Sequence, residues 1–408
     1  MTRIWILAAL YAVASAPADA QPDLADTTAA VRWNLLADRL GDEVGAAWAR
    51  AESLAEAGDS LTLVAMEAAG TPPNPSRLYA FLGAAQYRAA LDAGRDTASV
   101  RAAVAAASAA LLAEMSPYPE TDVAVWRALA ADLLAARRES GRARADAGER
   151  LGRACAARIL EWAKGDRSAV PWTGTIPAGV GMWTSNAGQM PVRAALPGWR
   201  PWLLVSAAQF RPSPPPAFGS PAFEAALEEV RQVARDRTPA QAEIARHWAE
   251  DSVWEPFVAD ALARRRATET EAARLYGVLG VAGWDTGIAC FEAKYHYMLL
   301  RPFHADTTLA TVEAVGRPNH PSYPSGHACF SGMTAAVLAA LLPDDAASIR
   351  RMAVESPMSR LYGGIHYRFD NEAGAALGRA VGEHTLAADR EGRLLSAAFD
   401  GPPPASGP

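Results

Sequence analysis

The stretch from Lys294 to Asp370 carries three short blocks of residues that any fold of this chain has to bring together. The blocks are Lys294 with Arg301-Pro302, then Pro324-Ser325-Gly326-His327, then Ser359-Arg360 followed by His366 and Asp370. Cationic, imidazole and hydroxyl side chains beside a flexible glycine are suited to holding a tetrahedral or trigonal oxyanion. The three blocks therefore predict an oxyanion site.

In the first block, Lys294 and Arg301 are seven residues apart in a segment with a helical pattern. Residues at this spacing share one face of a helix, and Pro302 is expected to end it. We therefore expect both cations to project into the same space.

The second block precedes an apolar segment, residues 328–342, that has the composition of a helix. The first amides of a helix are unpaired and carry the positive end of its dipole, so they favour an anion. Gly326 would let the backbone approach that anion closely, and Ser325 would cap the helix or donate its hydroxyl. His327 is expected at the rim of the site.

In the third block, the planar guanidinium of Arg360 can bind two oxygens at once. His366 and Asp370 are four residues apart and are expected to pair on the following helix. Such a carboxylate fixes the tautomer of the imidazole and leaves the other ring nitrogen free to attack or to ligate.

These blocks resemble the superfamily that joins type 2 acid phosphatases to vanadium-dependent haloperoxidases. Its pattern is Lys-x6-Arg-Pro, then Pro-Ser-Gly-His, then Ser-Arg-x5-His-x3-Asp, and every position is filled here. The segments 317–328 and 362–370 resemble the bacterial haloperoxidase branch, and weaker similarity extends upstream to residues 76–81. The resemblance implies an enzyme.

For a haloperoxidase, the resemblance implies a vanadate cofactor with hydrogen peroxide and halide as substrates. His366 would be the apical ligand of vanadate, and His327 would handle protons. Hydrogen bonds to the vanadate oxygens would come from Lys294, Arg301, Ser325, the Gly326 amide and Arg360. His320 matches a position that is histidine in algal bromoperoxidases and phenylalanine in chloroperoxidases, which favours bromide over chloride. A solvated loop histidine is the alternative at this position.

For an acid phosphatase of the same superfamily, the resemblance implies a phosphate ester as substrate and no cofactor. His366 would act as a nucleophile oriented by Asp370 and would form a phosphohistidine, while His327 would protonate the leaving alcohol. The motifs fit both activities, and the flanking segments favour the haloperoxidase. A third hypothesis is a helical protein that binds an oxyanion without catalysis.

Residues 1–20 combine a basic start, an apolar run and small residues before Gln21, which is typical of a secretory signal peptide. We therefore expect an exported protein, periplasmic or secreted. The net charge of −6 argues against a nucleic-acid partner. No later apolar run reaches the roughly 18–20 residues needed to span a bilayer, so a soluble mature chain without a membrane span is expected.

Helical periodicity recurs along the chain without a strand pattern, which predicts an all-α fold. The resemblance implies tandem four-helix bundles with the active site in the C-terminal one. The expected parts are a helical bundle over residues 21–165, a connecting segment rich in Pro, Gly and Trp over 166–220, a helical domain over 221–390, and a flexible tail over 391–408. Within the third part, helices are expected over 327–342, 344–356 and 370–388.

The connecting segment is expected to lie across the mouth of the site, with Trp199 or Trp202 as an aromatic wall. Packing between helices is an equally good interpretation of these tryptophans. Of the three cysteines, Cys290 and Cys329 flank site residues and could bridge, or they could be small buried thiols. Family members are often dimers, so the resemblance allows a homo-oligomer. The predicted core includes Leu338, Leu341, Leu377 and Val381.

Overall fold

The computed structural model describes residues 27–40, 75–95, 97–115, 119–185, 190–250 and 253–400. Helices dominate these residues, which contain no β-strand, and Met182 and Leu299 form an isolated β-bridge. The all-α prediction is confirmed. The predicted signal segment, residues 1–20, and the last part of the predicted tail, residues 401–408, lie outside the described residues.

The described residues fall into two compact units. The first unit runs to Glu161 and also includes Glu255–Gly280, and the second comprises Trp162–Trp254 and the chain from Val281 onward. The predicted limits of the bundles near residues 165 and 220 stay a prediction. All the predicted site residues belong to the second unit.

The first unit is built from closely packed helices rich in small residues. They are residues 29–40, α4 (Pro75–Arg95), α5 (Val100–Met115), α6 (Pro119–Ser140), most of α7 (Arg142–Ala163), most of α10 (Trp254–Arg264) and the beginning of α11 (Glu269–Tyr297). A buried chain of hydrogen bonds crosses three of them: the Asn34 amide donates to Gln86 at 2.8 Å, and Gln86 donates to the Ser108 hydroxyl at 2.9 Å. Polar groups in this core are thereby satisfied.

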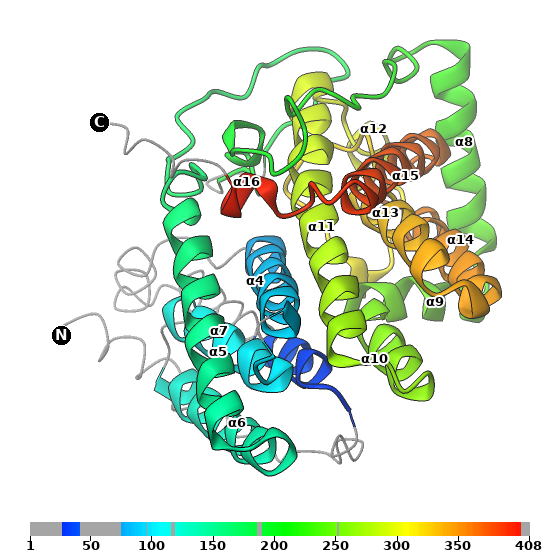
Figure 1. Cartoon of the computed structure of the whole chain (residues 1–408). Helices are drawn as coiled ribbons and strands as arrows, with labels where there is room; N and C mark the ends of the chain where they lie inside the picture. Colours follow the sequence, from blue (N-terminus) through cyan, green and yellow to red (C-terminus); the bar gives the residue numbers. More distant parts are fainter. Residues whose placement is uncertain are drawn as a thin grey trace. The chain divides into compact units, whose positions relative to one another are not determined.

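The second unit contains the rest of α11 and the C-terminal helices (Figure 1). They are α8 (Pro221–Asp236), α9 (Pro239–Glu250), α12 (Pro302–Ala305), α13 (Gly326–Leu341), α14 (Ala346–Tyr362), α15 (Arg368–Arg390) and α16 (Ser396–Phe399). The expected end of α14 at residue 356 is wrong, because the helix continues through Pro357. Ser359, Arg360 and Leu361 are buried there, and this packing offsets the backbone hydrogen bond that the proline removes.

The helices α13 and α15 lie side by side with their backbones in contact (Figure 1). Glycines make this approach possible: a methyl group added at Gly378 would overlap the carbonyl oxygen of Cys329, and one at Gly374 would stand 2.5 Å from that of Ser325. The contact brings the start of α15 to the turn that precedes α13. Of the predicted core residues, Leu338, Leu377 and Val381 are buried, and Leu341 is partly buried.

The segment between α7 and α8 has little helix but is firmly attached. The backbone N–H groups of Trp202, Leu203 and Leu204 donate to the buried carboxylate of Asp285 on α11, at 2.6, 2.8 and 3.2 Å. Burial raises the pKa of Asp285 to about 6, and the three amide bonds oppose that rise. One carboxylate thus fixes three successive residues of the connecting segment.

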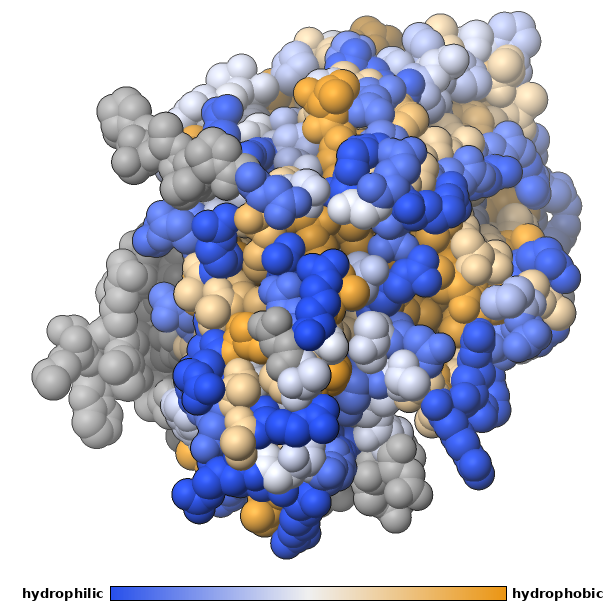
Figure 2. Space-filling view, viewed as in Figure 1, coloured by the Kyte–Doolittle hydropathy of each residue, from blue (hydrophilic) through white to orange (hydrophobic). Residues whose placement is uncertain are grey.

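None of the helices in the described parts of the chain is both long enough and apolar enough to cross a membrane. On the face seen in Figure 2, hydrophilic residues are interspersed with hydrophobic ones.

Candidate active site

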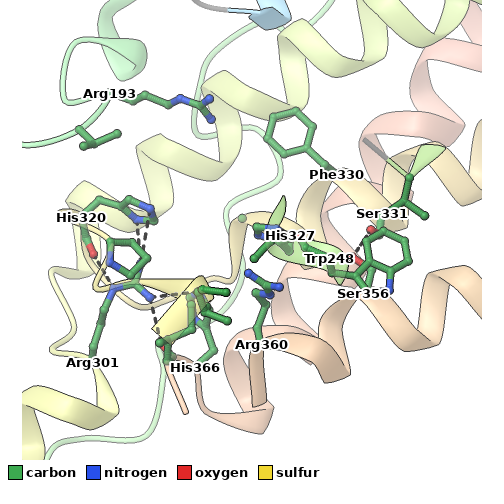
Figure 3. Close-up of a pocket in the computed structure, with 18 of the residues that line it drawn as sticks. Arg193, Trp248, Arg301, His320, His327, Phe330, Ser331, Ser356, Arg360 and His366 are labelled. Carbon is green, nitrogen blue, oxygen red and sulfur yellow. Dashed lines mark hydrogen bonds between the residues drawn. The ribbon is translucent and has the colours of Figure 1, made fainter. Parts of the chain in front are cut away.

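A cavity of about 560 Å³ in the second unit collects residues from all three sequence blocks (Figure 3). Six of the predicted site residues line it, namely Arg301, His320, Gly326, His327, Arg360 and His366. Lys294 and Ser325 are fully buried beside Gly326, and Asp370 is fully buried beneath His366. The structure therefore brings every predicted site residue to one place.

The expected helical stripe of Lys294 and Arg301 is wrong. The helix α11 ends at Tyr297, Met298 has a positive φ of 52°, and Arg301 is the residue that precedes α12. The left-handed residue redirects the chain, so the two cations reach the site from different directions.

Lys294 and Arg301 converge on one loop nevertheless. The Lys294 ammonium donates to the carbonyls of Pro321 and Ser322, both at 2.9 Å. The Arg301 Nε donates to the carbonyl of His320 at 2.9 Å. Hydrogen bonds to the loop before α13 therefore hold both cations in place.

Arg301 also joins the two ends of the site. Its Nη1 donates to the Ile365 carbonyl at 2.9 Å and lies 3.3 Å from His366 Nε2. Its Nη2 lies 3.1 Å from His320 Nδ1. Figure 3 shows His320 and His366 on either side of its guanidinium. This arginine therefore orients the rings of both histidines.

Arg360 enters from the C-terminal turn of α14. Its Nε donates to the Ser359 hydroxyl and its Nη2 to the Ala245 carbonyl, both at 2.9 Å. Arg360 has 2% of its surface exposed, so these bonds hold it in a fixed direction. Its guanidinium faces the cavity near His327 (Figure 3).

The three cations are buried without a salt bridge in the described structure, although the charge of the nearby Asp370 acts on Lys294 and Arg301. Among the described residues, no salt bridge involves Lys294, Arg301 or Arg360, although each is at most 2% exposed. Burial lowers the pKa of Lys294 to about 8, of Arg301 to about 9 and of Arg360 to about 10. Buried cations of this kind are costly unless an anion compensates them.

The turn before α13 offers further donors. Ser325 precedes the helix as its N-cap, but its side chain makes no capping bond, and its buried Oγ has no hydrogen-bond partner among the described residues. A methyl group added at Gly326 would meet no protein atom closer than Lys294 Cε, at 4.0 Å. The space above Gly326 is thus free for a guest that the Ser325 hydroxyl and the helix amides can reach.

His366 and Asp370 form the predicted pair, with Nδ1 and Oδ2 2.8 Å apart. His366 lies before α15 rather than on it, because the helix begins at Arg368. The same Oδ2 accepts from the Ser322 hydroxyl at 2.6 Å and from the Tyr367 amide at 3.1 Å. With Nδ1–H bound to this carboxylate, Nε2 carries the lone pair of the ring and accepts from Arg301 Nη1 at 3.3 Å.

Electrostatics favours a neutral ring at His366. Burial and the nearby charges of Arg301 and Lys294 lower its pKa well below the usual value. Burial raises the pKa of Asp370 to about 6, against the hydrogen bond from Ser322 and the charge of Lys294. A neutral imidazole with an unprotonated Nε2 is the form needed for attack or ligation.

His327 lies in the first turn of α13 with its ring open to the cavity. Its Nε2–H donates a hydrogen bond to the Trp248 carbonyl at 3.1 Å. Although the ring is exposed, the surrounding protein and the charge of Arg360 lower the pKa of His327. The ring is therefore neutral at pH 7, and its place on the cavity wall lets it reach a guest there.

The donor set fits an oxyanion such as vanadate or phosphate. It consists of N–H and O–H groups around one histidine nitrogen, with a Ser325 hydroxyl that lacks a partner in the described structure. Among the described residues, no group of three or more His, Cys, Asp or Glu side chains could hold a metal cation. The residues present therefore fit a group that is bound through its oxygens.

Sequence patterns missed part of the wall. Arg193, Trp248, Phe291 and Phe330 line the cavity outside the three blocks, and Ser322 supports Asp370 from the loop before the second block. Phe291 stands three residues before Lys294, a helical spacing that could have identified it. Arg193 and Trp248 have no comparable signal, because only the tertiary fold brings them here.

The expected aromatic wall from Trp199 or Trp202 is wrong, since neither lines the cavity. Trp199 stacks on Trp284 with ring centroids 5.2 Å apart. Trp202 packs on Trp162 at 4.7 Å, and its Nε1 donates to the Leu394 carbonyl at 2.8 Å. These tryptophans hold the connecting segment in place, as the packing interpretation predicted.

Comparison with known proteins identifies relatives of two kinds. The PAP2 superfamily model matches residues 272–391. A vanadium-dependent bromoperoxidase of Ascophyllum nodosum is 36% identical over 100 residues, which cover 17% of this chain and 18% of that protein. A non-specific acid phosphatase of Salmonella typhi is 29% identical over 185 residues, which cover 42% of this chain and 70% of that protein. The chain thus spans less than a fifth of the bromoperoxidase.

Solved structures extend the likeness to most of the chain. A bacterial vanadium-dependent iodoperoxidase superposes with a TM-score of 0.64 and 25% identity, over 78% of this chain and 91% of that one. A bacterial vanadium-dependent chloroperoxidase superposes with a TM-score of 0.61 over 78% of this chain and 93% of that one. At 13% identity, the second match shows a shared fold alone.

Proposed function

We propose that this protein, whose residues 272–391 form a PAP2 superfamily domain, is a vanadate-dependent haloperoxidase-type enzyme that oxidises halide with hydrogen peroxide. One observation carries the proposal: Lys294, Arg301 and Arg360 are buried around one cavity without a salt bridge in the described structure, and the single nearby charge of Asp370 does not balance all three. The iodoperoxidase likeness, over 91% of that chain, supports the choice of a haloperoxidase.

The anion-binding roles follow from the positions of the donors. Lys294, Arg301 and Arg360 would neutralise the oxyanion, and the Ser325 hydroxyl with the Gly326 amide would bind its oxygens at the start of α13. His366 would ligate vanadate through Nε2, because Asp370 holds its Nδ1 at 2.8 Å. Bound vanadate supplies a Lewis acid that activates hydrogen peroxide towards halide.

Proton transfer falls to His327. In the anion-free protein its lowered pKa leaves it neutral at pH 7. A bound anion would raise that pKa again, so that the ring can accept a proton from hydrogen peroxide entering the cavity. The Trp248 carbonyl accepts from Nε2, which leaves Nδ1 as the basic nitrogen. The ring would later return the proton to the departing hydroxyl group.

His320 is proposed to lie beside the halide, with bromide preferred over chloride. Its ring contacts Arg301 and packs against Phe291 with centroids 5.3 Å apart, at the cavity wall. The pKa of His320 is lowered well below its usual value by burial and by the charges of Lys294 and Arg301. The preference itself rests on the family resemblance at this position.

The alternative is a phosphatase that hydrolyses phosphomonoesters. It is favoured by the match to non-specific acid phosphatases over 70% of the Salmonella typhi protein. His366 Nε2 would attack phosphorus and the ester oxygen would leave with a proton from His327, so that a phosphohistidine forms and an alcohol departs. Water would then hydrolyse the phosphohistidine, with the three cations stabilising the transition state.

Paired assays on one preparation separate the two activities. Bromination of a phenolic indicator with hydrogen peroxide is measured before and after addition of orthovanadate, alongside hydrolysis of an aryl phosphate. We expect bromination that rises with vanadate and falls in His327→Ala. Phosphate release without a vanadate-dependent bromination would support the phosphatase instead. A protein with neither activity, indifferent to His327→Ala, would be an oxyanion-binding protein.

Export of the chain belongs to the same proposal. It is supported by the sequence of residues 1–20, and the periplasm or the medium is the expected location.

A further inference from the structure

The cavity has an outer part that the three sequence blocks do not explain. At about 560 Å³ it falls in the range of pockets that hold organic ligands, about 300–1,000 Å³. Trp248, Trp254, Phe291 and Phe330 contribute to its wall. A small oxyanion with halide or peroxide would reach Phe291 beside His320 but would leave the rest of this aromatic part unused.

The charge of the wall has one sign. Among the described residues that line the cavity none is acidic, whereas Arg193, Arg301 and Arg360 are cationic. Arg301 and Arg360 serve the inner end, next to His366. Figure 3 shows Arg193 apart from them, towards Phe330. The outer part is therefore both aromatic and positively charged.

Arg193 is held at this position by its backbone and by a ring. Its φ of 58° is in the left-handed region, which is strained for a residue other than glycine. Its guanidinium lies 5.4 Å from the centroid of Phe291, a cation–π distance. No salt bridge in the described structure pairs it with a carboxylate, and it is exposed to the cavity.

We propose that Arg193 is a specificity-determining residue that binds the carboxylate of an aromatic acid, the organic substrate class of this enzyme. The aromatic ring of that acid would lie against Phe291 and Phe330, within reach of the inner oxyanion. The inference rests on the proposed function, because it assumes that the inner end holds vanadate or phosphate. It adds that a neutral or cationic aromatic compound is a poorer ligand.

Calorimetric titration tests this with two probes, orthophosphate for the inner end and 4-hydroxybenzoate for the outer end in saturating orthophosphate. The variants are Arg193→Ala, Arg193→Lys and the control Arg200→Ala. Arg200 belongs to the same segment and also stacks on a ring, at 5.0 Å from Trp162, but does not line the cavity.

We expect Arg193→Ala to weaken the binding of 4-hydroxybenzoate at least tenfold and the binding of orthophosphate less than twofold. Arg193→Lys should have an intermediate affinity for 4-hydroxybenzoate, and Arg200→Ala should bind both probes as the wild type does. The proposal would be overturned if the wild type and Arg193→Ala bound 4-hydroxybenzoate with the same affinity. It would also be overturned if the wild type bound phenol as tightly as 4-hydroxybenzoate. Failure of orthophosphate to bind would instead count against the proposed oxyanion site.

A separate observation concerns the two cysteines next to the site. The sulfur atoms of Cys290 on α11 and Cys329 on α13 are 2.8 Å apart, and both residues are fully buried. Even carbon atoms, which are smaller, keep about 3.5–4.0 Å when they are not bonded. A disulfide bond is about 2.0 Å long, so only a small movement separates these thiols from a bond.

We infer that Cys290 and Cys329 form a disulfide in the exported protein. Two thiols would lose two protons and two electrons to a disulfide donor, which is reduced to two thiols as the sulfur–sulfur bond forms. The link would join α11, which carries Lys294, to α13, which begins at Gly326. Cys155, buried in the first unit, would remain a free thiol.

Thiol titration of the denatured full-length protein, purified from an export compartment without reductant, tests this inference. We expect one thiol per chain before reduction and three after it, since the chain has three cysteines. Cys155→Ala should then show no thiol before reduction, and reduction should lower the melting temperature. Three thiols before reduction, or a disulfide between two chains, would overturn the inference.

Discussion

His366 Nδ1 lies 2.8 Å from Oδ2 of Asp370, a buried carboxylate that also accepts from Ser322 and from the Tyr367 amide. Three donors on one oxygen fix the direction of the carboxylate, and the carboxylate fixes the imidazole. Nε2 of His366, the nitrogen proposed to bind or attack, is therefore positioned by residues behind the ring.

Asp370→Asn should lower activity about 10–100-fold, the usual effect of losing the partner of a ligating histidine. The amide can donate to Nδ1 and so favour the wrong tautomer, in which Nε2 carries the proton. The measurement is kcat for whichever activity the paired assays identify. Glu372→Gln, an exposed position on the same helix, is the control and should keep wild-type activity. Equal rates in the two variants would contradict the role of Asp370.

Orthovanadate or orthophosphate should raise the melting temperature, because the anion binds the folded state and compensates its buried cations. At 100 times Kd the stabilisation is about 2.7 kcal/mol. Lys294→Met should lose most of this shift. The control Lys164→Met changes the other lysine of the chain, which is exposed, and should keep the full shift in melting temperature. Differential scanning calorimetry over a series of anion concentrations makes the comparison.

Anion affinity should fall as the pH rises above about 8. Burial lowers the pKa of Lys294 to about 8, and a bound anion would raise that pKa again. Binding above pH 8 therefore takes up a proton, so Kd should increase up to tenfold per pH unit between pH 8 and 9. Titration with sulfate, whose own charge is constant there, measures this. A flat profile in the wild type would contradict it, and the profile of Lys294→Met should be shallower, with the remaining slope due to Arg301, whose pKa burial lowers to about 9.

Ser325→Ala should affect anion binding, whereas Ser322→Ala should affect stability. The Ser325 hydroxyl is buried without a partner in the described structure, so its removal should not destabilise the anion-free protein but should weaken anion binding about 5–30-fold. Ser322→Ala removes a 2.6 Å bond to a buried carboxylate and should cost about 1.5–3 kcal/mol of stability. Denaturant unfolding and anion titration of both variants would show the contrast.

Gly378→Ala should destabilise the protein by about 1–3 kcal/mol, because its methyl group would overlap the backbone of α13. Gly326→Ala is the matched case: its methyl group has space, so the fold should tolerate it while anion binding weakens. Urea unfolding of the anion-free variants tests both expectations. Similar losses of stability at the two glycines would contradict them.

The sequence was sufficient to predict that the three blocks meet, because each contains residues with one shared chemistry. It was not sufficient to predict how they meet. Met298 adopts a positive φ that nothing in a methionine favours, so the expected helix through Arg301 ends early. Ser359 and Arg360 lie on a helix that crosses Pro357, because burial outweighs the proline.

The outer wall was the least predictable part. Arg193 lies a hundred residues before the first block and has no motif around it, and Trp248 contributes its backbone carbonyl as well as its ring. Trp199 and Trp202 were expected in the wall because aromatic residues often line a cavity. In the structure Trp199 packs on Trp284 and Trp202 on Trp162 instead. Such choices depend on tertiary contacts that no local pattern records.

The attachment of the connecting segment through Asp285 has a consequence for how the enzyme could be altered. Residues 202–204 are tied to the same helix that bears Lys294, while Arg193 lies on the chain ahead of that tie. Single side chains such as Arg193 could therefore be exchanged with the anchor retained, whereas the backbone of residues 181–183 has to stay, because it bonds to residues 298–300 just ahead of Arg301. The exchange would change which molecules gain entry and leave the machinery for the inorganic anion where it stands.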